Sequence, residues 1–290
     1  MALPRGLPVV DHHCHLSPDG EGVRAAARFQ AAGGTHLFLA TQNYDRRPLT
    51  DLEDYRRQFD TTEKLARQVH ESTGVVVYPV LAPYPIDLLE VAPAIGLAAA
   101  LELHRAALDL AGARVRERRA VALGEVGRPH FPVAPDLQEA SREAFRHALS
   151  TARDASCPVV VHSEDLDPAG YRGIAEEAGR AGVPLQRIVK HYARQRVAPA
   201  DAAGVTRSYL ARRELVRAVV DDPAPWFLET DFLDDPGRPG AVLDLATVPR
   251  RARAIAEESA HGADRLWGPF SESIERVYGW RPAVEDRPVA

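Results

Sequence analysis

The sequence is short of several residue types and patterns, and each shortage narrows what the chain can be. Only two of the 290 residues are cysteine, too few for a disulfide framework and compatible with a reducing compartment. No apolar run approaches the roughly 18 residues of a membrane span. The first ten residues also lack the long apolar segment of a signal peptide. We therefore expect a cytoplasmic protein that has no membrane partner.

Positive charge is also in short supply. Lys64 and Lys190 are the only lysines, and the 36 basic residues are outnumbered by 41 acidic ones, which gives a formal net charge of -5. An acidic chain is a poor general trap for a phosphate backbone, although a local basic groove stays open. A small-molecule substrate is thus favoured over nucleic acid as the partner.

What the sequence does contain is enough apolar material for a large core and a regular alternation of two patterns. Hydrophobic residues make up 45% of the chain, and its length suits an α/β barrel. Short apolar runs alternate with longer segments of helical periodicity, which predicts parallel strands joined by helices. The expected strands are 7–15, 35–40, 74–82, 119–127, 157–164, 186–193, 225–232 and, more weakly, 264–270.

Polar side chains collect where these strands end. The residues concerned are His13, His15, Glu125, His162, His191 and Asp231. A doubly wound sheet would spread them along an edge, whereas the strand ends of a (β/α)8 TIM barrel converge on one mouth. We therefore predict a single TIM-barrel domain over residues 1–290.

These six residues form a candidate metal site. His13 and His15 are two positions apart on a strand and point the same way. Burying six polar groups without partners would cost roughly several kcal/mol for each group. One or two divalent ions would give all six a partner. Mixed imidazole and carboxylate ligands suit Zn²⁺ or Mn²⁺, with Mg²⁺ as a further candidate. Singly, each residue has a structural alternative, such as a hydrogen-bonded core histidine.

Four motifs carry a family resemblance that spans residues 9–231. "VVDHHCHL" resembles the D-x-H-x-H-L opening of TatD-family metal-dependent hydrolases, in the amidohydrolase superfamily, and "ALGEVG", "PVVVHSED" and "LETD" resemble their later motifs. The resemblance implies a binuclear site. In it, His13, His15 and Asp231 hold one ion and His162 and His191 the second, with Glu125 between the two ions.

The resemblance also implies the chemistry. A metal-bound water attacks the substrate, and Asp231 is the catalytic residue that accepts its proton. Glu229 shares the parity of Asp231 and is a candidate acceptor for a ligand imidazole. Asp11 either supports the ligands in the same way or lies in the barrel floor.

The loops around these motifs depart from typical members. "GRPHF" stands where nuclease-type members read G-L-D-Y, and "VKHYA" replaces H-C-F-S-G. These departures favour a divergent branch that hydrolyses a small-molecule ester, lactone, amide or phosphoester. The alternatives are a TatD-type DNase or phosphodiesterase and, less favoured, a non-catalytic metal-binding protein. Arg128, His130 and Lys190 are candidate substrate-binding residues, each with a purely structural alternative.

Overall fold

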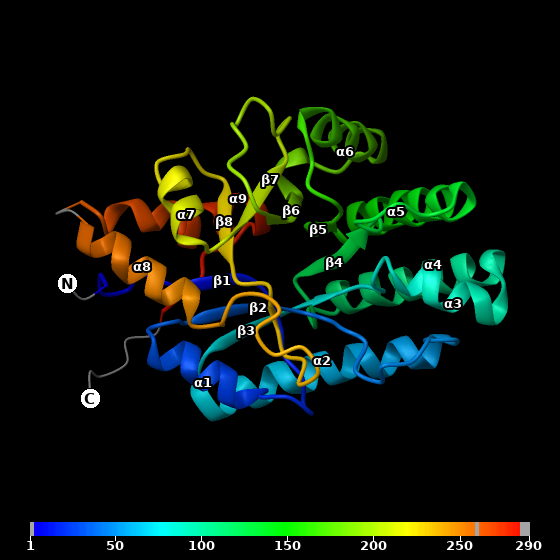
Figure 1. The fold of residues 1–290 in the computed structure, drawn as a ribbon, viewed down its shortest axis with the longest axis horizontal. Helices are drawn as coiled ribbons and strands as arrows, with labels where there is room; N and C mark the ends of the chain where they lie inside the picture. Colours follow the sequence, from blue (N-terminus) through cyan, green and yellow to red (C-terminus); the bar gives the residue numbers. More distant parts are fainter. Residues whose placement is uncertain (1–2, 259–260, 285–290) are drawn as a thin grey trace.

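The strands form one curled, all-parallel sheet with the helices outside it (Figure 1). The computed structural model describes residues 3–258 and 261–284. Within these ranges the strand order is β8-β7-β6-β5-β4-β3-β2-β1-β9. The strands are β1 (Val10–His15), β2 (His36–Ala40), β3 (Val76–Leu81), β4 (Ala122–Gly127), β5 (Val159–His162), β6 (Ile188–Ala193), β7 (Thr206–Leu210), β8 (Trp226–Glu229) and β9 (Phe232–Leu233).

The sheet closes on β1. Strand β9 continues the direction of β8 after a two-residue break and pairs with β1 at Cys14 and His15. In the break, the Asp231 amide donates to the His13 carbonyl over 3.0 Å. The last strand is thus joined to the first, and the predicted (β/α)8 TIM-barrel class is confirmed.

Helices follow the strands in chain order. They are α1 (Val23–Ala31), α2 (Leu52–Thr73), α3 (Asp87–Ile95), α4 (Leu97–Arg116), α5 (Pro135–Ala155), α6 (Pro168–Ala181), α7 (Arg213–Val219), α8 (Thr247–Glu258) and α9 (Ser273–Tyr278). Helix α2 shows why such bounds are sharp. The Asp51 carboxylate accepts from the Asp54 amide in a capping box, and Gly74 ends the helix with φ 71°.

Two kinds of buried cluster divide the strand residues. The barrel interior collects side chains from many strands, among them Phe38, Val80, Val160 and Phe227. Alternate residues face outward and pack under the helices, as Leu37 and Leu39 do beneath α1 and α2. This alternation leaves the strand ends as the place where polar side chains can converge.

The sequence prediction was wrong at two places. Residues 264–270 are not a strand; they form a 3₁₀ turn at Asp264–Leu266 and part of a π-helical turn at Gly268–Glu272. The eighth unit of the barrel is instead completed by β7, whose Thr, Arg and Ser residues interrupt the apolar run that marks the other strands. Among the described residues, no helix is long and apolar enough to cross a membrane.

Candidate metal centre

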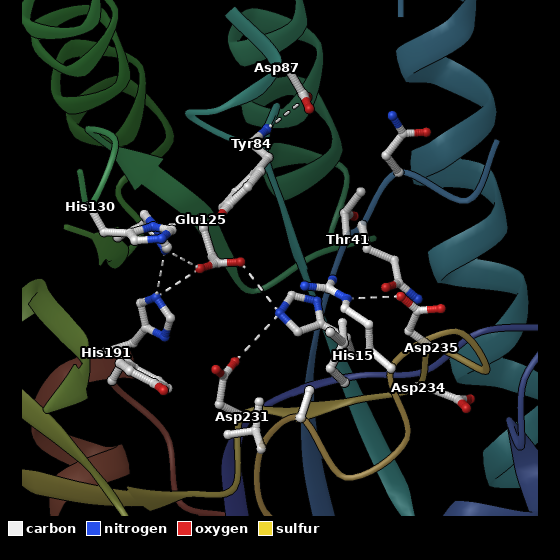
Figure 2. Close-up of a pocket in the computed structure, with 18 of the residues that line it drawn as sticks. His15, Thr41, Tyr84, Asp87, Glu125, His130, His191, Asp231, Asp234 and Asp235 are labelled. Atoms are coloured by element: carbon white, nitrogen blue, oxygen red, sulfur yellow. Dashed lines mark hydrogen bonds and ion pairs between the residues drawn. The ribbon is translucent and has the colours of Figure 1, made fainter. Parts of the chain in front are cut away.

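All six predicted site residues lie together at the carboxyl ends of the strands. Figure 2 labels four of them, His15, Glu125, His191 and Asp231. His13 and His15 come from β1 and Glu125 from β4, while His162 and His191 end or nearly end β5 and β6. Asp231 lies in the break between β8 and β9, where its φ of 49° is in the left-handed region. Such a conformation is unusual for a residue other than glycine and is often found at functional sites.

The first donor set comprises His13, His15 and Asp231. The Nε2 atoms of the two histidines are 3.2 Å apart. Asp231 Oδ1 lies 3.6 Å from His13 Nε2 and 3.7 Å from His15 Nε2. Glu125 Oε2 reaches the same two nitrogens at 3.7 and 3.4 Å. His13, His15 and Asp231 thus lie close enough together to hold one divalent ion, and a second group of possible ligands, His13, Glu125 and His191, shares His13 with the first.

The second donor set lies on the other oxygen of Glu125. Its Oε1 is 2.8 Å from His162 Nδ1 and 2.7 Å from His191 Nε2. The two imidazole nitrogens are themselves 3.2 Å apart. Glu125 therefore turns one carboxylate oxygen toward each donor set.

Charge at this centre is governed by burial and by the carboxylates. Burial disfavours a charged His191, but the Glu125 and Glu229 carboxylates outweigh it and raise its pKa to about 10. Burial likewise opposes charge on Glu125, yet the histidines around it hold its pKa well below the usual range. Burial raises the pKa of Asp231 to about 7. The buried carboxylates thus favour positive charge at the centre, which a bound cation would supply.

Two buried acids support the ligands from behind. Glu229 is fully buried, lies 3.5 Å from His191 Nδ1 and accepts the Tyr192 amide over 2.6 Å. It is placed to orient His191. Asp11 instead accepts the amide and the hydroxyl of Thr230, at 3.0 and 2.6 Å, so it fastens β1 to the break that carries Asp231.

The centre opens into a pocket of about 1060 Å³. Glu125, His162, His191 and Asp231 lie in its lining, together with segments of the loops that follow β2, β3, β5 and β9. A pocket of this volume at the carboxyl end of a barrel is the usual setting for a small-molecule site.

Comparison with known proteins identifies the family. The sequence model of the family described as TatD related DNase matches residues 10–279. The chain belongs to the TatD family. It is 28% identical over 282 residues to the uncharacterized protein MJ1127 of Methanocaldococcus jannaschii, a match that covers 96% of this chain and 98% of that protein.

Solved structures agree on the fold. The TatD-like protein AF1765 from Archaeoglobus fulgidus is 14% identical with a TM-score of 0.63, over 93% of this chain and 100% of that one. The TatD homolog YJJV from Escherichia coli is 19% identical with a TM-score of 0.60, over 93% and 98% of the two chains. Membership of the TatD family and the histidine–carboxylate cluster together identify a metal-dependent hydrolase.

The three residues predicted to bind substrate in this TatD-family protein have different surroundings. His130 lines the pocket, with its Nδ1 2.9 Å from His162 Nε2. Arg128 is not among the residues that line the pocket. It pairs with Glu164, which does line the pocket.

Lys190 is not among the described residues that line the pocket, and its contact with substrate stays a prediction. Its ammonium group is buried and donates to the carbonyls of Ser163, at 3.3 Å, and His191, at 2.6 Å. Alternation along β6 turns it away from the side that carries His191.

Sequence reasoning missed other residues of the pocket, notably Tyr84 after β3, Arg46 after β2 and Asp235 after β9. Strand β3 ends without a metal-binding side chain, so nothing in the pattern singled out the loop that follows it. Tyr84 stands between two prolines, in "APYPID", and that rigid setting was the available signal.

Proposed function

We propose that this protein hydrolyses a small-molecule ester, lactone, amide or phosphoester with two divalent ions, Zn²⁺ or Mn²⁺, with Mg²⁺ as a further candidate. The supporting observation is that Glu125 presents one oxygen to each of two donor sets beside an open pocket. His13, His15 and Asp231 would hold the first ion. His162 and His191 would hold the second.

Bound divalent ions would supply Lewis acidity, which lowers the pKa of a water molecule and polarises the bond under attack. The chain supplies the proton acceptor. Asp231 belongs to the first donor set and also lines the pocket, so its carboxylate would lie beside a water molecule held by the first ion. We assign it the role of taking the proton of the attacking water and returning it to the leaving group.

The charges of the pocket favour a small substrate over a nucleic acid strand. Each of the four arginines in the described lining is already paired with an acid. Arg46 and Arg238 both lie 3.1 Å from Asp235. Arg194 pairs with Asp165, and Arg47 with Asp54, each over 2.5 Å. Binding of a DNA backbone needs cationic side chains that are free to neutralise its phosphates. In this pocket the charges of the lining arginines are already balanced by neighbouring carboxylates.

A turnover screen with Zn²⁺- and Mn²⁺-loaded protein tests the proposal. It should contain esters, lactones, amides, phosphoesters and DNA, with Asp231→Asn as the matched inactive control. We expect metal-dependent turnover of a small molecule that the control lacks. Salt-sensitive DNA binding with DNA as the best substrate would replace our proposal with the DNase alternative. Loaded protein that is inactive on every class would contradict both.

A further inference from the structure

Nε2 of His162, the ring nitrogen that does not face Glu125, has two polar neighbours. His162 Nε2 lies 2.9 Å from Nδ1 of His130 and 3.3 Å from the hydroxyl of Tyr84. The two neighbours come from different loops, one after β4 and the other after β3. Their shared partner, His162, belongs to the second donor set. Both loops therefore contact the candidate metal centre at the same imidazole ring.

The chemistry of imidazole decides how this contact works. His162 turns Nδ1 toward Glu125 and His191, so Nδ1 is the nitrogen available to an ion. Nε2 must then carry the hydrogen, because a neutral imidazole has one donor and one acceptor nitrogen. One N–H makes one good hydrogen bond, and His130 Nδ1 is the nearer acceptor. The Tyr84 hydroxyl is therefore left with its proton to donate elsewhere.

The backbone holds Tyr84 firmly in place. The Asp87 carboxylate accepts the Tyr84 amide over 3.0 Å, and the Asp87 amide donates back to the Tyr84 carbonyl over 2.9 Å. Asp87 is itself buried and bonded by the Tyr55 side chain. Figure 2 shows the Tyr84 ring reaching from its loop toward Glu125. A phenol on the pocket wall is thus fixed above the carboxylate shared by the two donor sets.

We infer that the Tyr84 hydroxyl donates a hydrogen bond to the substrate oxygen that gains negative charge, and that His130 is a positioning residue which holds His162 in the required tautomer. The inference rests on the proposed function. A phenol hydroxyl has one hydrogen to donate. A donor aimed at developing charge accelerates hydrolysis more than one aimed at the ground state.

Inorganic phosphate is the probe for Tyr84, because it is a tetrahedral oxyanion and its binding needs no knowledge of the substrate. Its affinity should be measured by calorimetry on metal-loaded wild type, Tyr84→Phe and Tyr44→Phe, with metal content determined on the same samples. Tyr44 is the matched control: it lines the same pocket, but its hydroxyl bonds to Thr62 Oγ1 over 2.9 Å.

We expect Tyr84→Phe to weaken phosphate binding about tenfold or more at unchanged metal content, as befits a hydrogen bond to a charged group. Tyr44→Phe should bind phosphate like wild type. Equal affinity in wild type and Tyr84→Phe would overturn the inference, as would loaded wild type that binds no phosphate. A protein that takes up no metal would instead overturn the proposed function itself, and the metal analysis separates the two failures.

His130 is tested by rescue. In His130→Ala the hydrogen bond to His162 is lost, and the affinity for the second ion should fall about 10- to 100-fold, as when other groups that orient metal ligands are removed. His130→Asn should restore much of it, because the amide oxygen can take the place of Nδ1. Both variants should melt like wild type without metal, since His130 is exposed. Equal metal affinity in wild type and His130→Ala would contradict the positioning role.

Discussion

Two adjacent histidines of β1 lie in contrasting regions of the barrel. His12 lies in an aromatic floor: its ring stacks on Phe227 with centroids 3.8 Å apart, and its Nε2 lies 2.9 Å from the Tyr278 hydroxyl. His13 lies in the polar mouth, within 3.7 Å of carboxylate oxygens from Glu125 and Asp231. Both side chains are almost fully buried.

The comparison teaches that burial alone does not make a metal site. Burial lowers the pKa of His12 to about 3 and that of His13 to about 4, so both imidazoles are neutral. His13 differs from His12 in that the carboxylates of Glu125 and Asp231 lie opposite its ring and favour a positive charge there. At His191, where burial is outweighed by carboxylates, the pKa rises to about 10.

The largest expected effect comes from removing the proton acceptor of the mouth. Asp231→Asn is nearly isosteric, and its amide oxygen can still act as a weak ligand. It cannot accept a proton, and kcat should fall about 10²- to 10⁴-fold. The measurement is kcat on a substrate from the screen, beside metal content and a thermal melt. Near wild-type kcat with full metal would require another base, and an unfolded variant would make Asp231 a structural residue.

Alanine at each of the two histidines should then separate stability from metal binding. His12→Ala empties a space packed by aromatic rings and should lower the free energy of unfolding by about 2–4 kcal/mol, near the range for large core truncations. His13→Ala should lower it by less than half as much when both are compared in a chelator. Urea unfolding gives both values. Equal losses of unfolding free energy in the two variants would show that His12 and His13 contribute alike to stability, against the contrast drawn between the aromatic floor and the polar mouth.

The burial of His12 in the aromatic floor also predicts that stability falls in acid. His12 has a folded pKa of about 3 against 6.5 for the free side chain. The unfolded chain therefore binds more protons at His12 between these values. The contribution of His12 to the free energy of unfolding is fully present above pH 6.5 and is lost as the pH falls toward 3, by about 1.4 kcal/mol per pH unit. His12→Phe should reduce this slope in chelator-treated protein. A slope unchanged by the substitution would assign the acid response to other groups.

The smallest expected effect lies at the rim of the pocket, which here means Arg128 and its partner Glu164. Arg128 is paired with Glu164, and Glu164 lines the pocket whereas Arg128 does not. Exposed pairs are worth about 0.2–1 kcal/mol, so Arg128→Ala should raise KM about two- to fivefold and leave metal content unchanged. A loss of metal in this variant would show that the rim and the centre are coupled more closely than their contacts indicate.

The sequence predicted the mouth better than its surroundings, and the reason is physical. Strand ends of a barrel must converge, so the positions of His13, Glu125 and His191 in the chain were enough to place them together. Helix α2 was equally readable, because its cap at Asp51 and its terminal glycine are local signals.

Features that depend on contacts between distant segments were not readable. Strand β7 was missed because its Thr206, Arg207 and Ser208 are buried by neighbours rather than by their own hydrophobicity. The pairing of Arg46 with Asp235 joins loops almost 200 residues apart, and no local pattern encodes it. The contact of Tyr84 with His162 is of the same kind.

Metal content tests the central claim most directly. Elemental analysis should be performed on wild type, His13→Ala and His12→Ala after incubation with Zn²⁺ or Mn²⁺ and removal of the excess. The account predicts about two ions per chain in wild type and in folded His12→Ala, and a clear loss in His13→Ala. Wild type that retains no ion, or a loss that is the same at both histidines, would contradict a metal centre at the mouth of this barrel.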